Sequence, residues 1–260
     1  MERRVLWTAA ALLAIGIVGV TVLFIKNNTV SVPAHSGAYA EGMVGQPSYV
    51  NPVLAATEDD QSLVRLVYAS VNDLADSIDT SADGRTIQVH LKQNLVWSDG
   101  QPLNSDDIVF TLQSIQNPDS RSPLAGLFDG VKADRVSALQ VDFHMENITL
   151  SSAILNLRPA PKHLYGDIPP ANWRLSNYNL KPVASGPYAF SSHDAGADGF
   201  INAYRLVVNN SYSGTKPYLQ KVNFLFFHNE TDMLAAFNNG QVQGFGTNDP
   251  GLLEGIKRPY

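Results

Sequence analysis

The sequence lacks cysteine entirely, and this absence excludes several kinds of chemistry at once. Disulfide bonds, thiolate metal sites, iron–sulfur ligation and cysteine nucleophiles all require a thiol. The lipid-modified cysteine that anchors many exported bacterial proteins is excluded as well. Because a chain without cysteine suits both reducing and oxidising compartments, the compartment must be inferred from other features.

Basic charge is also scarce. The 260 residues include 18 lysines and arginines against 24 aspartates and glutamates, which gives a formal net charge of −6. We therefore expect no face basic enough to neutralise nucleic-acid phosphates, and we predict no nucleic-acid partner. Apolar residues make up 44% of the chain, which is enough for one large domain or two small ones and argues against disorder.

Common catalytic signatures are missing too. The sequence has no G-x-S-x-G, G-x-x-x-x-G-K-[ST], G-x-G-x-x-G or H-E-x-x-H motif, and its six histidines are scattered. The adjacent acids Asp106 and Asp107 are explained by their place at the start of a predicted helix. Glu58 and Asp59, on a predicted loop, could form a carboxylate pair but are interpreted first as solvated side chains. We predict no catalytic residue, no metal and no cofactor, and we interpret the protein as a non-enzyme.

A long uncharged run lies near the N-terminus. From Val5 to Ile25 the chain has 21 residues without a charge, which as a helix would span roughly 31 Å, the thickness of a hydrocarbon core. Arg3 and Arg4 precede the run, so we predict a membrane anchor with a cytoplasmic tip and an exported remainder. A cleaved signal peptide is the alternative, although its apolar core is usually only about 7–15 residues long.

The rest of the chain alternates between strand and helix patterns. Residues 27–38 are predicted to be a linker, with order beginning near Tyr39 in a strand that ends in a shaped loop. Asp59 or Asp60 is expected to cap the first helix, and Asn104 or Ser105 the second. Apolar spacing predicts helices at 60–68, 104–117, 229–239 and 250–257, and strands at 86–91, 139–145, 188 onward, 203–208 and 222–227. These elements indicate a mixed α/β fold.

The order of several segments resembles one known family. The segments are YAEGMVGQPSYVNP, SLVRLVY, DGRTIQVHLKQNLVWSDGQPLNSDDIVFTLQSIQNP, SPLAGLFDGV, LKPVASGPYAF and KPYLQKVNFLFFHNETDMLAAFNNGQV. Together they resemble the extracellular solute-binding proteins of family 5, the peptide, dipeptide and nickel receptors of ABC importers. The resemblance covers most of Tyr39 to Ile256, and WSDGQPLNSDDIVFTLQ is its most specific part.

The resemblance implies a periplasmic-binding-protein-like, mixed-sheet lobe, half of a two-lobed clamshell that closes around a ligand without covalent chemistry. It implies a peptide or small-solute ligand, permease and ATPase subunits as partners, and an extracytoplasmic location. Residues 1–26 are then the anchor or signal peptide, 27–38 the linker and 39–260 the first lobe. Carried onto matching positions, the ligand-binding candidates are Ala56, Thr57, Glu58, Asp59, Ser185, Gly186, Tyr188, Thr247 and Asn248.

Two departures from the family pattern affect this prediction. The segment between Tyr68 and Asp83 is short, which leaves room for one strand pair fewer, and the chain stops at Tyr260, where the family continues into its second lobe. A fragment of a longer protein is the first expectation. A receptor completed by another chain and a repurposed module remain open. The rival functions are an anchored interaction or sensory ectodomain and an extracytoplasmic hydrolase, for which no nucleophile and base have suitable spacing.

Overall fold

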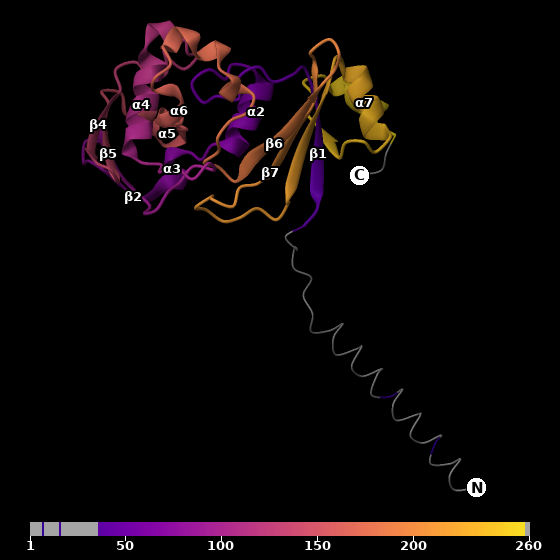
Figure 1. Cartoon of the computed structure of the whole chain (residues 1–260), viewed down its shortest axis with the longest axis horizontal. Coiled ribbons are helices and arrows are strands. Elements are labelled where there is room, and N and C mark those ends of the chain that lie inside the picture. Colours follow the sequence, from indigo (N-terminus) through magenta and orange to yellow (C-terminus); the bar gives the residue numbers. More distant parts are fainter. Residues whose placement is uncertain (1–6, 8–15, 17–35, 258–260) are drawn as a thin grey trace. The chain divides into compact units, whose positions relative to one another are not determined.

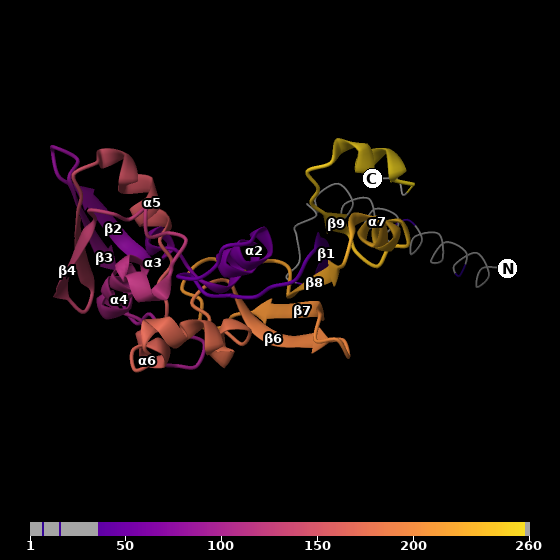
Figure 2. The ribbon, with the colours of Figure 1, turned by 90° about the horizontal axis from the view of Figure 1, so that it is seen from above.

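Two β-sheets organise the part of the chain that the computed structural model describes, namely Trp7, Gly16 and residues 36–257 (Figures 1 and 2). The strands are β1 (Ala38–Val44), β2 (Ala75–Thr80), β3 (Thr86–Leu91), β4 (Lys132–Ser137), β5 (Gln140–His144), β6 (Tyr188–Ala195), β7 (Ile201–Val208), β8 (Lys221–Phe227) and β9 (Gly244–Phe245). The helices are α2 (Glu58–Val67), α3 (Val71–Leu74), α4 (Ser105–Gln116), α5 (Ser151–Asn156), α6 (Lys162–Tyr165) and α7 (Glu230–Asn238). Short 3-10 helices lie at Pro118–Ser120, Ile148–Leu150, Pro170–Leu175, Asn177–Asn179 and Pro250–Gly255.

The first sheet is mixed, with the strand order β6-β7-β8-β1-β9. Strands β6, β7 and β8 pair antiparallel, whereas β1 pairs parallel with β8 along its whole length and with β9 at Glu41 and Gly42. Helix α7 packs against β1 and β8. Because β8, β1 and β9 run in the same direction, their carboxyl ends meet at one edge of the sheet.

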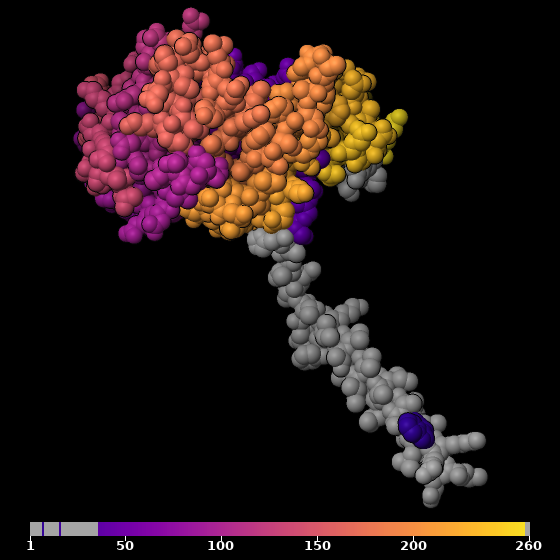
Figure 3. Space-filling model, viewed as in Figure 1, coloured from indigo at the N-terminus to yellow at the C-terminus, as the bar shows by residue number. Residues whose placement is uncertain are grey.

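The second sheet is antiparallel, with the order β2-β3-β5-β4. Its central strands β3 and β5 show the alternation that the sequence predicts, since Ile87, Val89, Val141 and Phe143 are buried. Helix α4 packs on β4 and β5. In the space-filling view, the residues of this antiparallel half and those of the mixed half occupy opposite ends of the face shown (Figure 3).

Helix α4 begins and ends where the sequence predicts. The Asn104 side chain accepts a hydrogen bond from the Asp106 amide at 2.8 Å, and the Asp107 carboxylate accepts one from the Asn104 amide at 3.0 Å, which makes a capping box. Ile108, Leu112 and Ile115, which lie on one face of the helix, are buried. The capping role of Asp107 supports the structural interpretation of this acidic pair.

One apolar core continues across both sheets. Its largest fully buried side chains include Trp97, Trp173, Tyr68, Tyr165 and Phe143. Residues from α2, α4, β3, β5, β7 and β8 all contribute to the same cluster. The described residues from Ser36 to Lys257 belong to one compact unit.

Several predicted boundaries need correction. Helix α2 starts two residues earlier than predicted and is capped by Thr57, because the Asp60 carboxylate is engaged elsewhere. The predicted C-terminal helix is a 3-10 turn, although Asp249 does cap it through the Gly251 amide. Leu139, the first residue of the strand predicted at 139–145, lies just before β5 and is 39% exposed.

The predicted membrane anchor at Val5–Ile25 lies outside the described residues, apart from Trp7 and Gly16, and so does most of the predicted linker. None of the helices among the described residues is both long and apolar enough to cross a bilayer.

Candidate functional site

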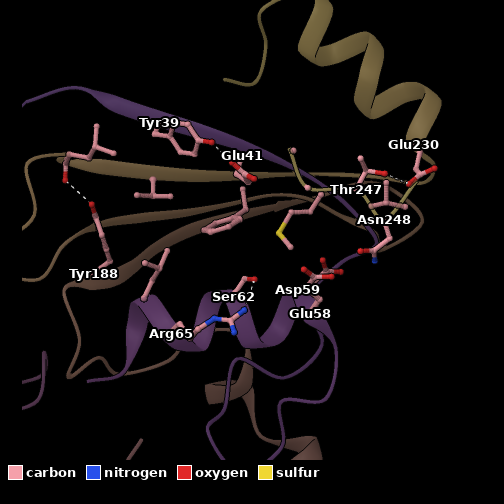
Figure 4. A pocket seen from close by; sticks show the side chains of 18 residues that line it. Tyr39, Glu41, Glu58, Asp59, Ser62, Arg65, Tyr188, Glu230, Thr247 and Asn248 are labelled. Atoms are coloured by element: carbon pink, nitrogen blue, oxygen red, sulfur yellow. Dashed lines mark hydrogen bonds between the residues drawn. The ribbon is translucent and has the colours of Figure 1, made fainter. Parts of the chain in front are cut away.

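A pocket of about 810 Å³ opens between helix α2 and the parallel edge of the mixed sheet (Figure 4). Strand β1 and helix α2 supply most of its wall, and the segment that follows β9 closes one side. The lining residues are Tyr39, Glu41, Gly42, Met43, Val44, Glu58, Asp59, Ser62, Arg65, Leu66, Tyr188, Leu219, Val222, Phe224, Glu230, Gly246, Thr247 and Asn248. It runs along the length of β1, from Tyr39 near the amino end to Val44 at the carboxyl end, and reaches Thr247 and Asn248 beyond β9.

The N-terminal end of α2 brings two acids to this pocket. The Thr57 hydroxyl caps the helix by accepting from the Asp60 amide at 3.1 Å. The Asp60 Oδ1 atom accepts from the amides of Ser48 and Tyr49 at 2.7 and 2.8 Å, so this side chain ties the loop after β1 to the helix. Glu58 and Asp59 take no part in these bonds and line the pocket.

Asp59 is the more buried of the two pocket acids on α2, with 9% of its surface exposed. Burial, and to a lesser degree the neighbouring charges of Asp60 and Glu58, together raise its pKa to about 6. Its Oδ2 atom lies 2.5 Å from the position that a Cβ on Gly45 would occupy, and Gly45 has φ of +118°. A glycine is therefore required directly beneath this carboxylate.

Two further carboxylates in the pocket are held by hydroxyl donors. The Tyr39 hydroxyl donates a short hydrogen bond to Glu41 Oε2 on the same strand, and burial raises the Tyr39 pKa to about 12. The Thr247 hydroxyl donates to Glu230 Oε1 at 2.9 Å and so links the segment after β9 to the start of α7. Both glutamates thus sit in fixed positions at the pocket wall.

The structure brings together five of the ligand-binding candidates predicted from the sequence. Glu58, Asp59, Tyr188, Thr247 and Asn248 all line the pocket, although they come from three separate parts of the chain. Tyr188 is 5% exposed, and its hydroxyl donates to the Leu219 carbonyl at 3.1 Å.

The other four candidates lie outside this pocket. Ala56 is exposed just before α2, and Thr57 serves as the helix cap. Ser185 and Gly186 are buried where the chain enters β6. Their amides donate to the Val67 carbonyl at 3.1 and 2.7 Å, and the Ser185 hydroxyl accepts from the Ala69 amide at 3.1 Å. These two residues fasten the mixed sheet to the end of α2.

Three charged lining residues were absent from the sequence-based candidates, namely Glu41, Arg65 and Glu230. Glu41 could have been noticed as a single acid inside the apolar strand pattern YAEGMV. The sequence does not mark Arg65 and Glu230 as pocket residues, because charged residues on helices are ordinarily solvated. Among the described residues, no group of three or more His, Cys, Asp or Glu side chains is placed to hold a metal ion.

The sequence is similar to a known protein family and to curated proteins. The sequence model described as "Bacterial extracellular solute-binding proteins, family 5 Middle" matches residues 69–258. The oligopeptide-binding protein AppA of Bacillus subtilis is 24% identical over 233 residues, which cover 82% of this chain and 41% of AppA.

Solved structures share the fold. The ABC transporter substrate-binding protein CtaP of Listeria monocytogenes is 32% identical with a TM-score of 0.69, over 80% of this chain and 44% of CtaP. AppA of Bacillus subtilis in complex with a nonapeptide is 22% identical with a TM-score of 0.76, over 87% of this chain and 47% of AppA. The chain therefore spans slightly less than half the length of these two relatives.

Proposed function

The chain belongs to family 5 of the bacterial extracellular solute-binding proteins, and we propose that it serves as substrate-binding component of an ABC importer. In this role it holds a peptide or a similar small solute at the parallel edge of the mixed sheet. It then delivers the solute to a membrane permease that works with ATPase subunits.

The observation that carries this proposal is the pocket itself. It has a volume typical of small-molecule sites, and its wall combines apolar strand residues with a few fixed polar groups. The protein names of the relatives support a peptide ligand, since AppA is an oligopeptide-binding protein and its solved structure holds a nonapeptide. Five of the nine candidates that the family resemblance implies are among its lining residues.

We also propose that binding is the whole of its chemistry. The relatives are solute-binding proteins, which favours a non-enzyme. The pocket carboxylates are engaged by hydroxyl donors or face one another's charge, an arrangement suited to recognition. A ligand would be released unchanged.

The location and domain organisation follow as part of the same proposal. The family description places its members outside the cell. We propose that residues 1–26 anchor the chain, 27–38 link the anchor to the domain, and 39–260 form the first lobe of a two-lobed receptor on the extracytoplasmic side. The uncharged run Val5–Ile25 after Arg3 and Arg4 supports the single-pass orientation.

The test uses the full 260-residue chain in lipid nanodiscs. A mixture of synthetic peptides of two to nine residues is passed over the immobilised chain, and retained peptides are identified by mass spectrometry and measured by calorimetry. We expect saturable binding that Glu58→Ala weakens about 3- to 10-fold, as for a hydrogen bond to a charged group at a solvated rim. The matched control is Glu254→Ala, an exposed acid outside the pocket. Failure to retain any peptide, or equal effects of the two variants, would contradict the proposal.

A further inference from the structure

Asp59 is a buried carboxylate without a hydrogen-bond or ion-pair partner. Only 9% of the residue's surface is exposed, and no donor among the described residues is hydrogen-bonded to its carboxylate, which borders the pocket. The structural tasks at this end of α2 are already filled by Thr57, which caps the helix, and by Asp60, which binds the loop after β1. The side chain of Asp59 points instead into the pocket, toward the segment of Thr247 and Asn248 (Figure 4).

The surroundings of Asp59 add negative charge. Glu58 on α2, Glu41 on β1 and Glu230 on α7 line the same pocket. Asp60, the next residue on the helix, has an Oδ2 atom buried without a hydrogen-bond partner. Among the lining residues the single Lys or Arg is Arg65, an exposed residue whose guanidinium donates to Ser62 at 3.3 Å.

A carboxylate that is buried without a partner is costly unless a positive group compensates it. The hydroxyl donors of the pocket do not supply that compensation, because Tyr39 is committed to Glu41 and Thr247 to Glu230. Four acids against one arginine also give the pocket a negative potential that attracts cations and repels anions.

We propose that this pocket recognises a cationic group on the solute, a primary ammonium or a guanidinium, and that Asp59 is the carboxylate that accepts its hydrogen bonds. The inference rests on the proposed solute-binding function and names the chemical class of the solute. The cation sits beside Asp59 and supplies the hydrogen-bond donors that the described residues do not. Glu58, at the exposed rim, attracts the cation but contributes less to its binding.

Protonation of Asp59 should make the affinity for the solute depend on pH. Its pKa is raised to about 6 by burial and by Asp60 and Glu58, so the empty pocket takes up a proton near that pH. Besides these two acids, the charged or titratable groups lining the pocket are Tyr39, Glu41, Arg65 and Glu230. A bound cation favours the ionised carboxylate, so it releases this proton, and affinity is highest above pH 6 and falls below it.

Four matched pentapeptides test the proposal on the full chain. They are Ala-Ala-Lys-Ala-Ala with both amines free, with the terminal amine acetylated, with the lysine amine acetylated, and with both acetylated. We expect the doubly acetylated peptide to bind about 10- to 100-fold more weakly than the best free-amine form, as for loss of a charge-assisted hydrogen bond. The two singly acetylated peptides show which amine enters the pocket.

The outcomes separate this proposal from the function on which it rests. Equal binding of all four peptides would overturn the cation site and leave solute binding intact. Binding of none would remove both, because a site for a solute group requires a solute. Tighter binding of the doubly acetylated peptide would also overturn the cation site.

Two isosteric variants assign the effect to Asp59. Asp59→Asn should abolish the preference for the free amine and flatten the pH profile between pH 5 and 7, while the doubly acetylated peptide binds as before. Asp79→Asn, which removes one exposed acid from β2 in the other sheet, should leave both properties unchanged. Retention of the amine preference in Asp59→Asn, with a native circular dichroism spectrum, would overturn the assignment.

Discussion

The two sheets of this protein differ in where the ends of their strands meet. In the mixed sheet, β8, β1 and β9 run parallel, and the residues that follow them converge at one end of the sheet, where they form one side of the pocket. In the antiparallel sheet neighbouring strands reverse direction, so each edge of that sheet mixes strand starts with strand ends. Chain direction thus explains why polar groups from separate segments gather beside the mixed sheet, although both sheets contribute to the same apolar core.

The largest effect should come from breaking the core of the antiparallel sheet. Phe143 on β5 is fully buried, and Phe143→Ala should lower the free energy of unfolding by about 3–5 kcal/mol through lost packing and a cavity. Urea unfolding at pH 7 measures it, with Leu175→Ala at an 82% exposed position as control. A loss under about 1 kcal/mol would show that this sheet does not carry the core.

The next largest loss of stability should come from a substitution where the end of α2 contacts the segment that enters β6. A Cβ on Gly186 would lie 2.8 Å from the Leu66 carbonyl oxygen and 2.9 Å from the Tyr68 amide nitrogen, both in the backbone. We expect Gly186→Ala to cost about 1–3 kcal/mol of unfolding free energy, as for overpacking. Gly126→Ala, with no atom within 4 Å of its Cβ, is the control. Equal midpoints in the two denaturation curves would refute the close contact.

The ionised Asp59 carboxylate should lower the free energy of unfolding at neutral pH. Because the folded-state pKa of Asp59 is raised to about 6 from 3.8, ionisation disfavours folding above pH 6, and the penalty fades as both states become protonated toward pH 4. Each pKa unit corresponds to about 1.4 kcal/mol, and solvent screening reduces this amount. Asp59→Asn should therefore raise the free energy of unfolding by about 1–2 kcal/mol at pH 7.

The comparison for this variant is Asp79→Asn on β2, where no gain is expected at any pH. Unfolding free energies measured from pH 4 to pH 7 give the profile. A gain that is constant across this range, or largest at pH 4, would contradict burial of an unpaired charge at Asp59.

The smallest effect concerns Thr57, which is a helix cap in the structure and was a ligand candidate in the sequence. Thr57→Ala should lower stability by about 1 kcal/mol through loss of the bond to the Asp60 amide. Thr57→Ser should retain it. Calorimetry with the best-bound peptide should show unchanged affinity in Thr57→Ala, and a marked loss of affinity would return this residue to the binding site.

The sequence predicted the central strands of the antiparallel sheet but not its edges. Strand β3 has the predicted bounds because its apolar residues alternate over a half-buried surface. Strands β2 and β4, with the sequences ADSIDT and KADRVS, are mostly exposed and have no such alternation. Both lie at sheet edges, where polar residues are tolerated and discourage pairing with other chains.

The candidate site shows a similar limit. Glu58, Asp59 and Asp60 are equivalent as letters at a helix start, yet one faces the rim, one is buried without a partner and one binds the Ser48 and Tyr49 amides. These differences depend on how the loop after β1 folds over α2, which is a long-range contact. Likewise, the turn at Ser185 and Gly186 is visible locally, but its packing against the end of α2 is not.

Hydrogen–deuterium exchange on the full chain, with and without the best-bound pentapeptide, tests most directly whether the parallel edge is the binding site. We expect added protection in residues 41–45, 57–66 and 244–249, which surround the pocket, and no change in residues 75–91 and 132–144 of the antiparallel sheet. Protection confined to the antiparallel sheet, or none at the pocket despite measured binding, would contradict the placement of the site.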